Sequence, residues 1–364
     1  MKILILANYG MGLYKFRKEL LQEFIQQNHE VYISLPRDEY TSKLEDLGCR
    51  FVETSVDRRG THPIRDLGLL MFYIRLMRKI RPDIALTYTI KPSTFGGVAC
   101  RWTGTPYIAN ITGLGTAMVN KGMMQNITKT LYRLGLKKAR CVFFQNVQNK
   151  QFFTGHRLIK KEAARLIPGS GVNVTEHSYE EYPPAGETLN CLFIGRIMKA
   201  KGIDELLEAA GKVKVRYPHI RFDLVGGCEE HYEDKLADYE NRGLITYRGV
   251  QTDVKSFIRK SHVAILPSYH EGTANVLLES AAAGRPVLAS RVAGCVETFD
   301  EGISGLGFEV KDADSLAETI LHFANLPHEK KQAMGAAGRA KMLSEYDRKR
   351  VVGAYLEELD KINR

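Results

Sequence analysis

The sequence predicts an α/β protein made of two doubly wound domains. Short apolar runs rich in β-branched residues alternate with longer amphipathic stretches along almost all of its 364 residues. That alternation is typical of parallel sheets covered by helices. At roughly 150 residues a domain, the length allows two domains. Pro168, Gly169 and Gly171, followed by Pro183 and Pro184, form a turn-rich stretch that separates two such series. We therefore expect a domain boundary within residues 170–188.

The first series has strands separated by longer helices. Its helices are expected over residues 13–27, 67–80 and 118–140, where apolar residues recur near helical spacing and basic residues are interleaved. Its strands are expected over residues 2–7, 31–35, 83–88, 106–111 and 141–145.

The second series repeats this pattern and ends in helix. Its strands are expected over residues 189–195, 222–226, 244–248, 263–266 and 286–290, again with helices between them. Residues 327–364 are helical in pattern and contain no further strand. The expected domains are 1–170 and 188–345, followed by a C-terminal helix over 346–364 that could pack back on the first domain.

Composition argues against several classes of protein. The six cysteines are scattered without a C-x-x-C pair, which disfavours a zinc site or a disulfide framework and fits a reducing cytoplasm. No apolar run approaches the ~20 residues that span a bilayer. The first apolar stretch is too short and wrongly flanked for a signal peptide. We therefore expect neither secretion nor membrane spanning.

The net charge of +10 is concentrated in the first part of the chain. Residues 1–150 hold 23 Lys and Arg against 11 Asp and Glu, whereas residues 151–364 hold 29 against 31. No acidic residue lies between Asp83 and Glu162, an interval with twelve Lys or Arg residues. Such a field attracts phosphates, nucleic acid or an anionic membrane surface. A basic surface that serves solubility alone is the alternative.

The loop after the first strand only partly resembles a dinucleotide-binding motif. It carries Gly10 and Gly12, but Lys15 occupies the place of the third glycine, and the second strand runs into Pro36 and Arg37 rather than an acid for a ribose. A bound dinucleotide cofactor is therefore not expected. The glycines allow either a close ligand contact or simply a tight strand-to-helix turn.

Two loops of the second series suit an anionic ligand. Gly195 and Arg196 end its first strand, and Lys201 and Gly202 precede a helix, so cations and free backbone amides gather where a diphosphate can bind. A solvated basic turn is the alternative. Residues 265–287 contain a strand, a glycine turn with Glu271, a helix with Glu279, and a second strand. We expect the amides of residues 272–275 to be open donors at that helix start.

Several motifs of the second half occur in a characteristic order. They are Gly195-Arg196, Lys201-Gly202, Val225-Gly226-Gly227, Pro267-Ser268, Glu271-Gly272, Glu279, Gly284 with Pro286-Val287, and the loop 294–297. Over its full length the chain resembles the retaining glycosyltransferases of family four, which have the GT-B fold of two domains facing across a cleft. Residues 13–17 and 91–96 are similar to those of polyprenyl-diphosphate-sugar N-acetylgalactosaminyltransferases, and enzymes of capsule and O-antigen synthesis are similar too.

The resemblance implies an acceptor-binding first domain and a second domain that binds a nucleotide diphosphate sugar, with uridine diphosphate as the expected nucleotide. Arg196 and Lys201 would neutralise the diphosphate, Glu279 would hold the ribose hydroxyls, and Glu271 would contact the transferred sugar. The implied donor residues are Gly195, Arg196, Lys201, Arg248, Glu271, Gly272, Thr273, Ala274, Asn275 and Glu279, of which Arg196, Lys201 and Glu271 are the expected catalytic residues. The implied acceptor or cleft residues are Gly10, Gly12, Arg17, Lys91, Asn110 and Thr112.

The chain departs from the family pattern at two places. Thr112 stands where the family commonly offers a histidine near the acceptor, which puts a histidine-activated acceptor in doubt. Thr273 and Ala274 replace the usual Phe-Pro after Glu271-Gly272, which leaves the sugar open. We expect His262 and His270 to be structural.

The expected chemistry needs no metal and no cofactor. Cleavage of the anomeric bond builds negative charge on the departing diphosphate, which positioned cations and helix amides stabilise. No Asp-x-Asp lies at a suitable place, since Asp312 and Asp314 are in a surface-like stretch. The resemblance implies retention by same-face attack, with the leaving phosphate taking the acceptor's proton.

The basic first half then fits a membrane-bound acceptor. Met118, Met123, Met124, Ile127 and Leu131 alternate with Lys121, Lys129, Arg133, Lys137, Lys138 and Arg140. This pattern suits peripheral attachment to an anionic membrane that carries a lipid-diphosphate-linked saccharide, on the cytoplasmic face of the plasma membrane. An ordinary packing helix with a solvated basic face is the alternative.

Three other functions compete with this interpretation. A GT-B enzyme with a soluble acceptor, or a sugar-nucleotide epimerase, shares the architecture. A catalytically silent relative is disfavoured because Arg196, Lys201, Glu271 and Glu279 are all present. A nucleic-acid-binding protein explains the basic half but not residues 271–287, and there is no aromatic platform, so no nucleic-acid partner is expected.

Overall fold

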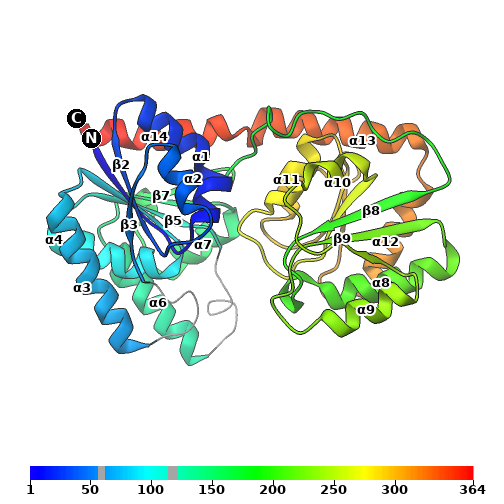
Figure 1. Cartoon of the computed structure of the whole chain (residues 1–364), viewed down its shortest axis with the longest axis horizontal. Coiled ribbons are helices and arrows are strands. Elements are labelled where there is room, and N and C mark those ends of the chain that lie inside the picture. Colours follow the sequence, from blue (N-terminus) through cyan, green and yellow to red (C-terminus); the bar gives the residue numbers. More distant parts are fainter. Residues whose placement is uncertain (56–61, 114–121, 364) are drawn as a thin grey trace. The chain divides into compact units, whose positions relative to one another are not determined.

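The computed structural model describes residues 1–55, 62–113 and 122–363 (Figure 1). It divides into two compact units. Unit 1 comprises Met1–Ser170 together with Val351–Arg364, and unit 2 comprises Gly171–Arg350. Each unit contains one parallel sheet flanked by helices. The predicted α/β class with two doubly wound sheets is therefore confirmed.

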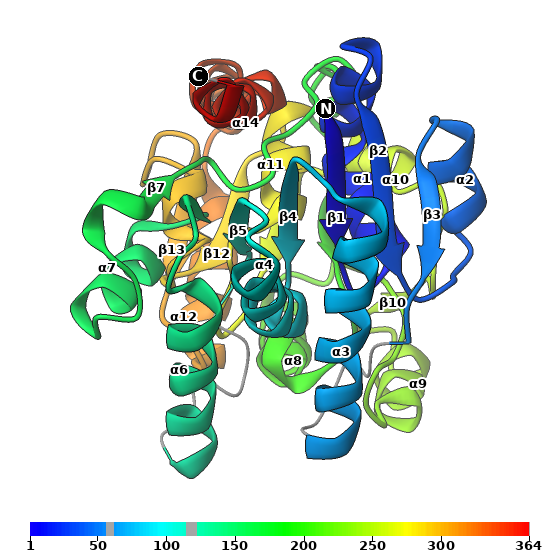
Figure 2. The ribbon, with the colours of Figure 1, turned by 90° about the vertical axis from the view of Figure 1, so that its left-hand side faces the viewer.

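Unit 1 is built on a seven-stranded sheet of order β3-β2-β1-β4-β5-β6-β7. Its strands are β1 Lys2–Leu6, β2 Glu30–Leu35, β3 Arg50–Glu53, β4 Ile84–Tyr88, β5 Tyr107–Ile111, β6 Cys141–Phe144 and β7 Ala164–Leu166. Its helices and helical turns are α1 Gly10–Gln26, α2 Thr41–Asp46, α3 Pro63–Ile80, η1 Pro92–Gly96, α4 Gly97–Thr103, α6 Met123–Leu136, α7 Val147–Gly155 and η2 Lys161–Ala163. Figure 2 shows this unit with α3 and α6 extending past the ends of the strands.

Both faces of the first sheet are covered, as the apolar strands require. Ile3 and Ile5 pack into a core shared with α1, α2 and the last helix, α14 (Arg348–Asn363). Leu4 and Leu6 point the other way, into a core formed with α3 and α4. Val351, Ala354, Tyr355 and Leu359 of α14 belong to the first of these cores, so the C-terminal helix packs on the first domain.

Unit 2 is built on a six-stranded sheet of order β10-β9-β8-β11-β12-β13. Its strands are β8 Leu189–Ile194, β9 Ile220–Val225, β10 Thr246–Tyr247, β11 Val263–Leu266, β12 Val287–Ser290 and β13 Gly305–Phe308. Its helices and helical turns are η3 Lys199–Lys201, α8 Ile203–Arg216, α9 Glu233–Asn241, α10 Lys255–Lys260, α11 Asn275–Ala282, η4 Val296–Thr298, α12 Ala313–Asn325, α13 His328–Lys341 and η5 Met342–Tyr346.

The stretch expected to be a linker is part of unit 2. Two arginines hold it there by hydrogen bonds to backbone carbonyls. Arg285, fully buried, donates to the carbonyls of Glu180 and Glu181 at 2.8 and 2.9 Å. Arg339 donates to the carbonyls of Val174 and His177 at 3.0 and 2.8 Å. Unit 2 therefore runs over Gly171–Arg350 rather than the expected 188–345.

The expected strands are present, and the structure adds three short ones. β3, β7 and β13 were not expected because β3 and β7 are short, partly exposed edge strands and β13 contains two glycines. The expected strand over 244–248 is confined to Thr246–Tyr247. The expected helix over 118–140 is described from Met123 to Leu136, and Met118 and Lys121 lie outside the described residues.

The two sheet orders fix where polar loops gather. In unit 1 the chain reverses direction across the sheet at β1 and β4, and in unit 2 at β8 and β11. Parallel sheets bind ligands outside the carboxyl ends of the strands at such a switch point, because adjacent loops there diverge to opposite faces. The loops after β1, β4, β8 and β11 are therefore the places to examine.

Candidate functional site

The loops after β8 and β11 are packed directly on each other. Gly202, at φ +71°, lies so close to the backbone after β11 that a Cβ there would be 2.1 Å from the carbonyl oxygen of Pro267. The Tyr269 amide donates to the Ala200 carbonyl at 3.0 Å. Glycine is needed at position 202 because only it combines this backbone conformation with so close an approach. The sequence order Lys201-Gly202 thus places Lys201 beside the second loop.

An ion pair joins the two loops. Lys201 Nζ contacts Glu271 Oε1, and both side chains are mostly buried, with 19% and 14% of their surfaces exposed. A buried pair is held in one geometry far better than an exposed one. The structure therefore brings together two of the three expected catalytic residues.

The start of α11 is packed against the loop that contains Gly294. Gly294, at φ +83°, approaches the carbonyl oxygens of Glu271 and Gly272 so closely that a Cβ would lie 2.8 and 2.6 Å from them. At the same place the Ala274 amide donates to the Gly294 carbonyl at 2.8 Å. The expectation that all amides of residues 272–275 are open donors is thus wrong for Ala274. Glu279 lies half-buried within α11, beyond this turn.

Arg196 follows β8 and already has an acidic partner. Its Nη1 lies 2.9 Å from Glu229 Oε2, in the loop after β9, and about half of the Arg196 side chain is exposed. Gly195 is held between strands, because its amide donates to the Val225 carbonyl at 2.9 Å and a Cβ at Gly226 would lie 1.8 Å from its carbonyl oxygen. Arg196 is therefore available from solvent on a rigid strand end.

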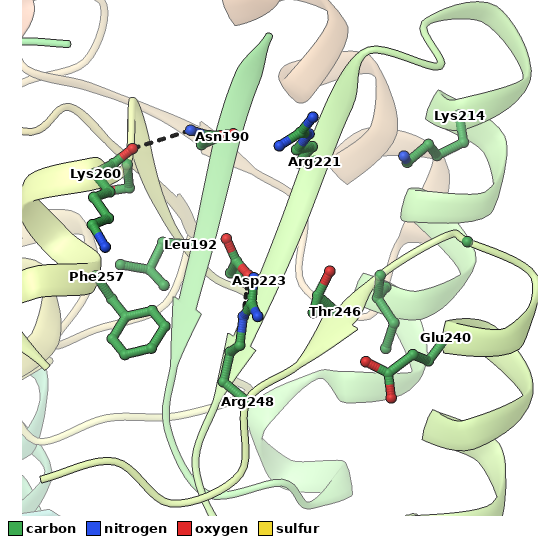
Figure 3. A pocket seen from close by; sticks show the side chains of 13 residues that line it. Asn190, Leu192, Lys214, Arg221, Asp223, Glu240, Thr246, Arg248, Phe257 and Lys260 are labelled. Carbon is green, nitrogen blue, oxygen red and sulfur yellow. Dashed lines mark hydrogen bonds and ion pairs between the residues drawn. The ribbon is translucent and has the colours of Figure 1, made fainter.

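The Arg248 side chain already has a partner on the face of the sheet. Its Nε pairs with Asp223 Oδ1 at 2.7 Å on the face of the sheet. Both line a cavity of about 650 Å³, shown in Figure 3, whose wall also includes Arg221, Phe257 and Lys260. None of the other expected donor residues lines this cavity. Alternation along β9 places Arg221 and Asp223 on one sheet face, which the sequence motif could not reveal.

The two histidines have depressed pKa values. Burial, followed by the charges of Lys331, His328 and Arg285, lowers the pKa of His262 to about 4. Its Nδ1 accepts the Asn190 amide at 3.0 Å, which agrees with a structural role. Burial also lowers the pKa of His270, and Lys201 acts in the same direction while Glu271 opposes it.

In unit 1 the glycine loop is occupied by the protein's own carboxylate. The Gly10 amide, at the start of α1, donates to Asp38 Oδ2 at 2.6 Å. A Cβ at Gly10 would lie 2.5 Å from Asp38 Oδ1, and one at Gly12 would lie 2.8 Å from the Tyr9 ring. A carboxylate at a helix N-terminus takes the place that a ligand phosphate could take. The alternative of a tight structural turn is therefore favoured for Gly10 and Gly12.

Lys91 and Thr112 lie in different surroundings. Lys91 Nζ pairs with Asp66 Oδ1 at 2.7 Å, with only 11% of either side chain exposed. Both residues line a cavity of about 360 Å³ with Phe72 and Arg65 of α3. Thr112, after β5, is exposed.

Arg17 and Asn110 belong to one buried polar network. Arg17 is 4% exposed, its guanidinium lies 5.4 Å from the centre of the Tyr88 ring, and it interacts with Tyr88 and Tyr355. The Tyr88 hydroxyl donates to the Tyr355 hydroxyl at 3.0 Å, and the latter donates to Asn110 Oδ1. Asn110 Nδ2 in turn donates to the Thr87 carbonyl at 3.1 Å. Burial lowers the pKa of Arg17, but the two tyrosines outweigh it, so the pKa is raised.

Several partners of the candidate residues were not expected from the sequence. They are Asp38, Asp66, Glu229 and Tyr355. Each lies at least 25 positions from the residue it contacts, so no local spacing could have indicated it. Among the described residues, no helix is long and apolar enough to cross a membrane.

These features define a class of protein with two doubly wound domains and a loop site of cations and carboxylates at a sheet switch point. Comparison with known families gives the identification. Residues 2–146 match the family described as glycosyl transferase 4-like, and residues 188–325 match the family described as glycosyl transferases group 1. The chain therefore carries a domain of each family and is a glycosyltransferase, and the predicted resemblance is confirmed.

Relatives and solved structures agree with this assignment. The N,N'-diacetylbacillosaminyl-diphospho-undecaprenol alpha-1,3-N-acetylgalactosaminyltransferase of Campylobacter jejuni is 28% identical over 100% of this chain and 99% of its own. CapM, a capsular polysaccharide biosynthesis glycosyltransferase of Staphylococcus aureus, is 24% identical over 77% of each chain. A glycosyltransferase of Rickettsia africae superposes with a TM-score of 0.82 at 19% identity, covering 100% of this chain and 98% of its own. HepE of Anabaena in complex with UDP-glucose gives 0.82 at 17%, covering 99% and 100%. These structures share the GT-B fold.

Proposed function

We propose that this glycosyltransferase moves a hexose or N-acetylhexosamine from a uridine diphosphate sugar to a lipid-diphosphate-linked saccharide in bacterial surface glycan assembly. The part of the proposal that concerns the sugar donor rests on the Lys201–Glu271 pair. This pair fixes a cation and a carboxylate on adjoining loops at the switch point of the unit 2 sheet. The part that concerns the acceptor is supported by the similarity to the Campylobacter enzyme, since that enzyme's name states a diphospho-undecaprenol substrate.

The proposed chemistry is carried by stabilisation of the leaving group. As the anomeric bond breaks, the electron pair stays on the diphosphate oxygen, and the added charge is stabilised by Lys201 and Arg196. The Glu271 carboxylate orients Lys201 and accepts hydrogen bonds from hydroxyls of the transferred sugar. The acceptor hydroxyl attacks on the face from which the diphosphate leaves, and its proton passes to the departing phosphate, so configuration is retained. Neither a metal nor a cofactor takes part in this scheme.

The proposed acceptor side is unit 1, attached peripherally to the cytoplasmic face of the plasma membrane. Helix α6 exposes Met123, Met124, Ile127 and Leu134, and Met123 is 81% exposed. Lys129 and Arg133 lie on the same helix. Exposed apolar side chains with interleaved cations suit insertion at an anionic headgroup layer. A bilayer is thus the proposed surface on which the acceptor is met.

Calorimetric titration with uridine, guanosine and adenosine diphosphates and their sugars tests the donor assignment. We expect selective binding of the uridine nucleotide, weakened by Arg196→Ala and by Glu279→Ala. Arg221→Ala is the matched control, because Arg221 lines the separate cavity on the sheet face and is not expected to affect donor binding. Equal binding of all three nucleotides, or none, would contradict the proposal.

A further inference from the structure

Arg17 is a buried cation for which the described part of the chain offers no acidic partner. Only 4% of it is exposed, and its Nη1 donates to the Phe16 carbonyl at 2.7 Å. Across the described ranges no carboxylate pairs with it, and its remaining contacts are with the tyrosines Tyr88 and Tyr355. Burial of an unpaired charge is costly, so such groups are normally paired or bind an anion. Arg17 is therefore poised for an anion that the described residues do not supply.

Three buried polar atoms, one of them on Arg17 itself, lack hydrogen-bond partners among the described residues. They are Arg17 Nε, Asn8 Oδ1 and Thr89 Oγ1. Asn8 is 8% exposed and Thr89 is half-buried. Thr89 also has a φ of 72°, an unfavourable conformation for a β-branched residue. Buried polar atoms are almost always hydrogen-bonded, so three together point to a ligand.

The strand order places Asn8 and Thr89 at the same edge of the unit 1 sheet. Asn8 follows β1 and Thr89 follows β4, two positions past the last register pair of these neighbouring strands, Leu6 with Thr87. Thr89 directly follows Tyr88, whose ring lies against the Arg17 guanidinium. This edge is the switch point of the unit 1 sheet, where such folds bind ligands.

We propose that Arg17, Thr89 and Asn8 form the binding site for the sugar-proximal diphosphate of the lipid-linked acceptor, and that Tyr355 positions Arg17. The inference rests on the proposed function for the identity of the acceptor. Arg17 Nε and the Thr89 hydroxyl donate to phosphate oxygens, which satisfies both orphan donors. Asn8 Oδ1 accepts a hydroxyl of the attached sugar.

Tyr355 has a positioning role because it is the central member of the hydrogen-bonded network. It accepts from Tyr88 and donates to Asn110, which is itself fixed by the Thr87 carbonyl. Removal of its hydroxyl leaves the ring packing intact but disconnects Tyr88 from Asn110. Arg17 then loses one of its two tyrosine partners and the orientation that this partner imposes.

The test is titration of inorganic diphosphate and of farnesyl diphosphate into protein saturated with UDP. We expect both probes to bind the unaltered protein, and Tyr355→Phe to weaken both by about threefold to tenfold, as loss of one hydrogen bond predicts. Tyr73→Phe is the matched control, because the buried Tyr73 hydroxyl has no partner to lose among the described residues. In turnover, Tyr355→Phe raises KM for the lipid acceptor and leaves KM for the donor unchanged.

Each other result overturns the inference. If Tyr355→Phe binds both probes as tightly as Tyr73→Phe does, the network is structural only. If farnesyl diphosphate binds but inorganic diphosphate does not, recognition lies in the hydrocarbon chain. If only inorganic diphosphate binds, the ligand is a free anion and not a lipid. If UDP does not bind, the proposed function is contradicted instead. The two diphosphate probes are then titrated without UDP, and Tyr355→Phe is again compared with Tyr73→Phe.

Discussion

Two lysines of one helical turn differ sharply in what they contact. Lys201 is mostly buried against Glu271, whereas Lys199, at the other end of η3, is exposed. We expect Lys201→Met to lower kcat/KM for the donor about 100-fold, because one charge-stabilising donor is lost from the leaving-group site. Lys199→Met should stay within about threefold. Steady-state kinetics of both variants check this, and equal losses would show that only general basic charge matters.

His262 makes the stability of unit 2 dependent on pH. Its pKa in the folded protein is lowered to about 4, chiefly by burial. An unfolded histidine takes up a proton near pH ~6.5, so protonation favours the unfolded state below that value. The contribution of His262 is complete above pH ~6.5 and is lost as the pH falls towards about 4.

Thermal unfolding of the full chain across this pH range measures the effect. His262→Asn keeps an acceptor for the Asn190 amide but cannot titrate. We expect this variant to show a smaller fall of Tm between pH ~6.5 and about 4 than the unaltered protein. Identical slopes would mean that other groups carry the acid sensitivity.

Lys201 and Glu271 were predicted to belong to one site, and the structure brings their side chains into contact. Lys201 lies in the loop after β8 and Glu271 in the loop after β11, and these are neighbouring strands whose loops meet at one edge of the sheet. The partners Asp38 and Asp66 were not expected, because tertiary folding alone brings them near. The contact of Arg248 with Asp223 was not expected for a related reason, since strand pairing sets it.

At the scale of elements, the approach of η3 to the end of β11 depends on a glycine. Gly202 and Gly243 both have positive φ, +71° and +66°, but only Gly202 has a backbone atom within 4 Å of the place of a Cβ. Gly243→Ala should cost about 1–2 kcal/mol of folding free energy from the strained backbone alone. Gly202→Ala should cost about 3 kcal/mol or more, because the loop must also move.

Chemical denaturation of the two glycine variants separates these effects. Gly202→Ala should also weaken UDP binding, since Lys201 is displaced with the loop, whereas Gly243→Ala should not. Equal destabilisation by the two substitutions would refute the requirement for close approach.

Helix α6 supplies the prediction about membranes. We expect Met123→Glu with Ile127→Glu to reduce binding to anionic liposomes about tenfold or more, because two exposed apolar anchors become charged. Val215→Glu on α8 is the control, since Val215 is 85% exposed but lies in unit 2. Cosedimentation at low and high salt is the measurement. Unchanged sedimentation of the α6 variant would locate attachment elsewhere.

Element-level prediction was good for buried strands and weak for edges. Core strands such as β1 and β4 are continuous apolar runs and were expected nearly to the residue. The edge strands β3 and β7 have mixed burial, so their composition resembles that of loops. The stretch 171–187 has turn-forming residues, but Arg285 and Arg339 bind its carbonyls and fold it into unit 2.

At the scale of the whole molecule, the two units differ in their charge and in the side chains that they present. Unit 1 carries most of the positive charge and exposes the apolar residues of α6, whereas unit 2 holds the Lys201–Glu271 pair. Both sheets place their polar loops at a switch point. Charge asymmetry, the alternating pattern and the motifs predicted this organisation, but they could not reveal Tyr355, which reaches the first sheet only because α14 packs there.

Transfer of a labelled sugar from its uridine diphosphate to an undecaprenyl-diphosphate-linked saccharide tests the central claim most directly. We predict that label moves into the organic-solvent-extractable lipid, that the new linkage keeps the donor's anomeric configuration, and that excess EDTA does not slow the reaction. Lys201→Met should abolish most of the transfer while Lys199→Met retains it. Label that reaches only water or a soluble saccharide, in reactions where the lipid acceptor is present, would contradict the account.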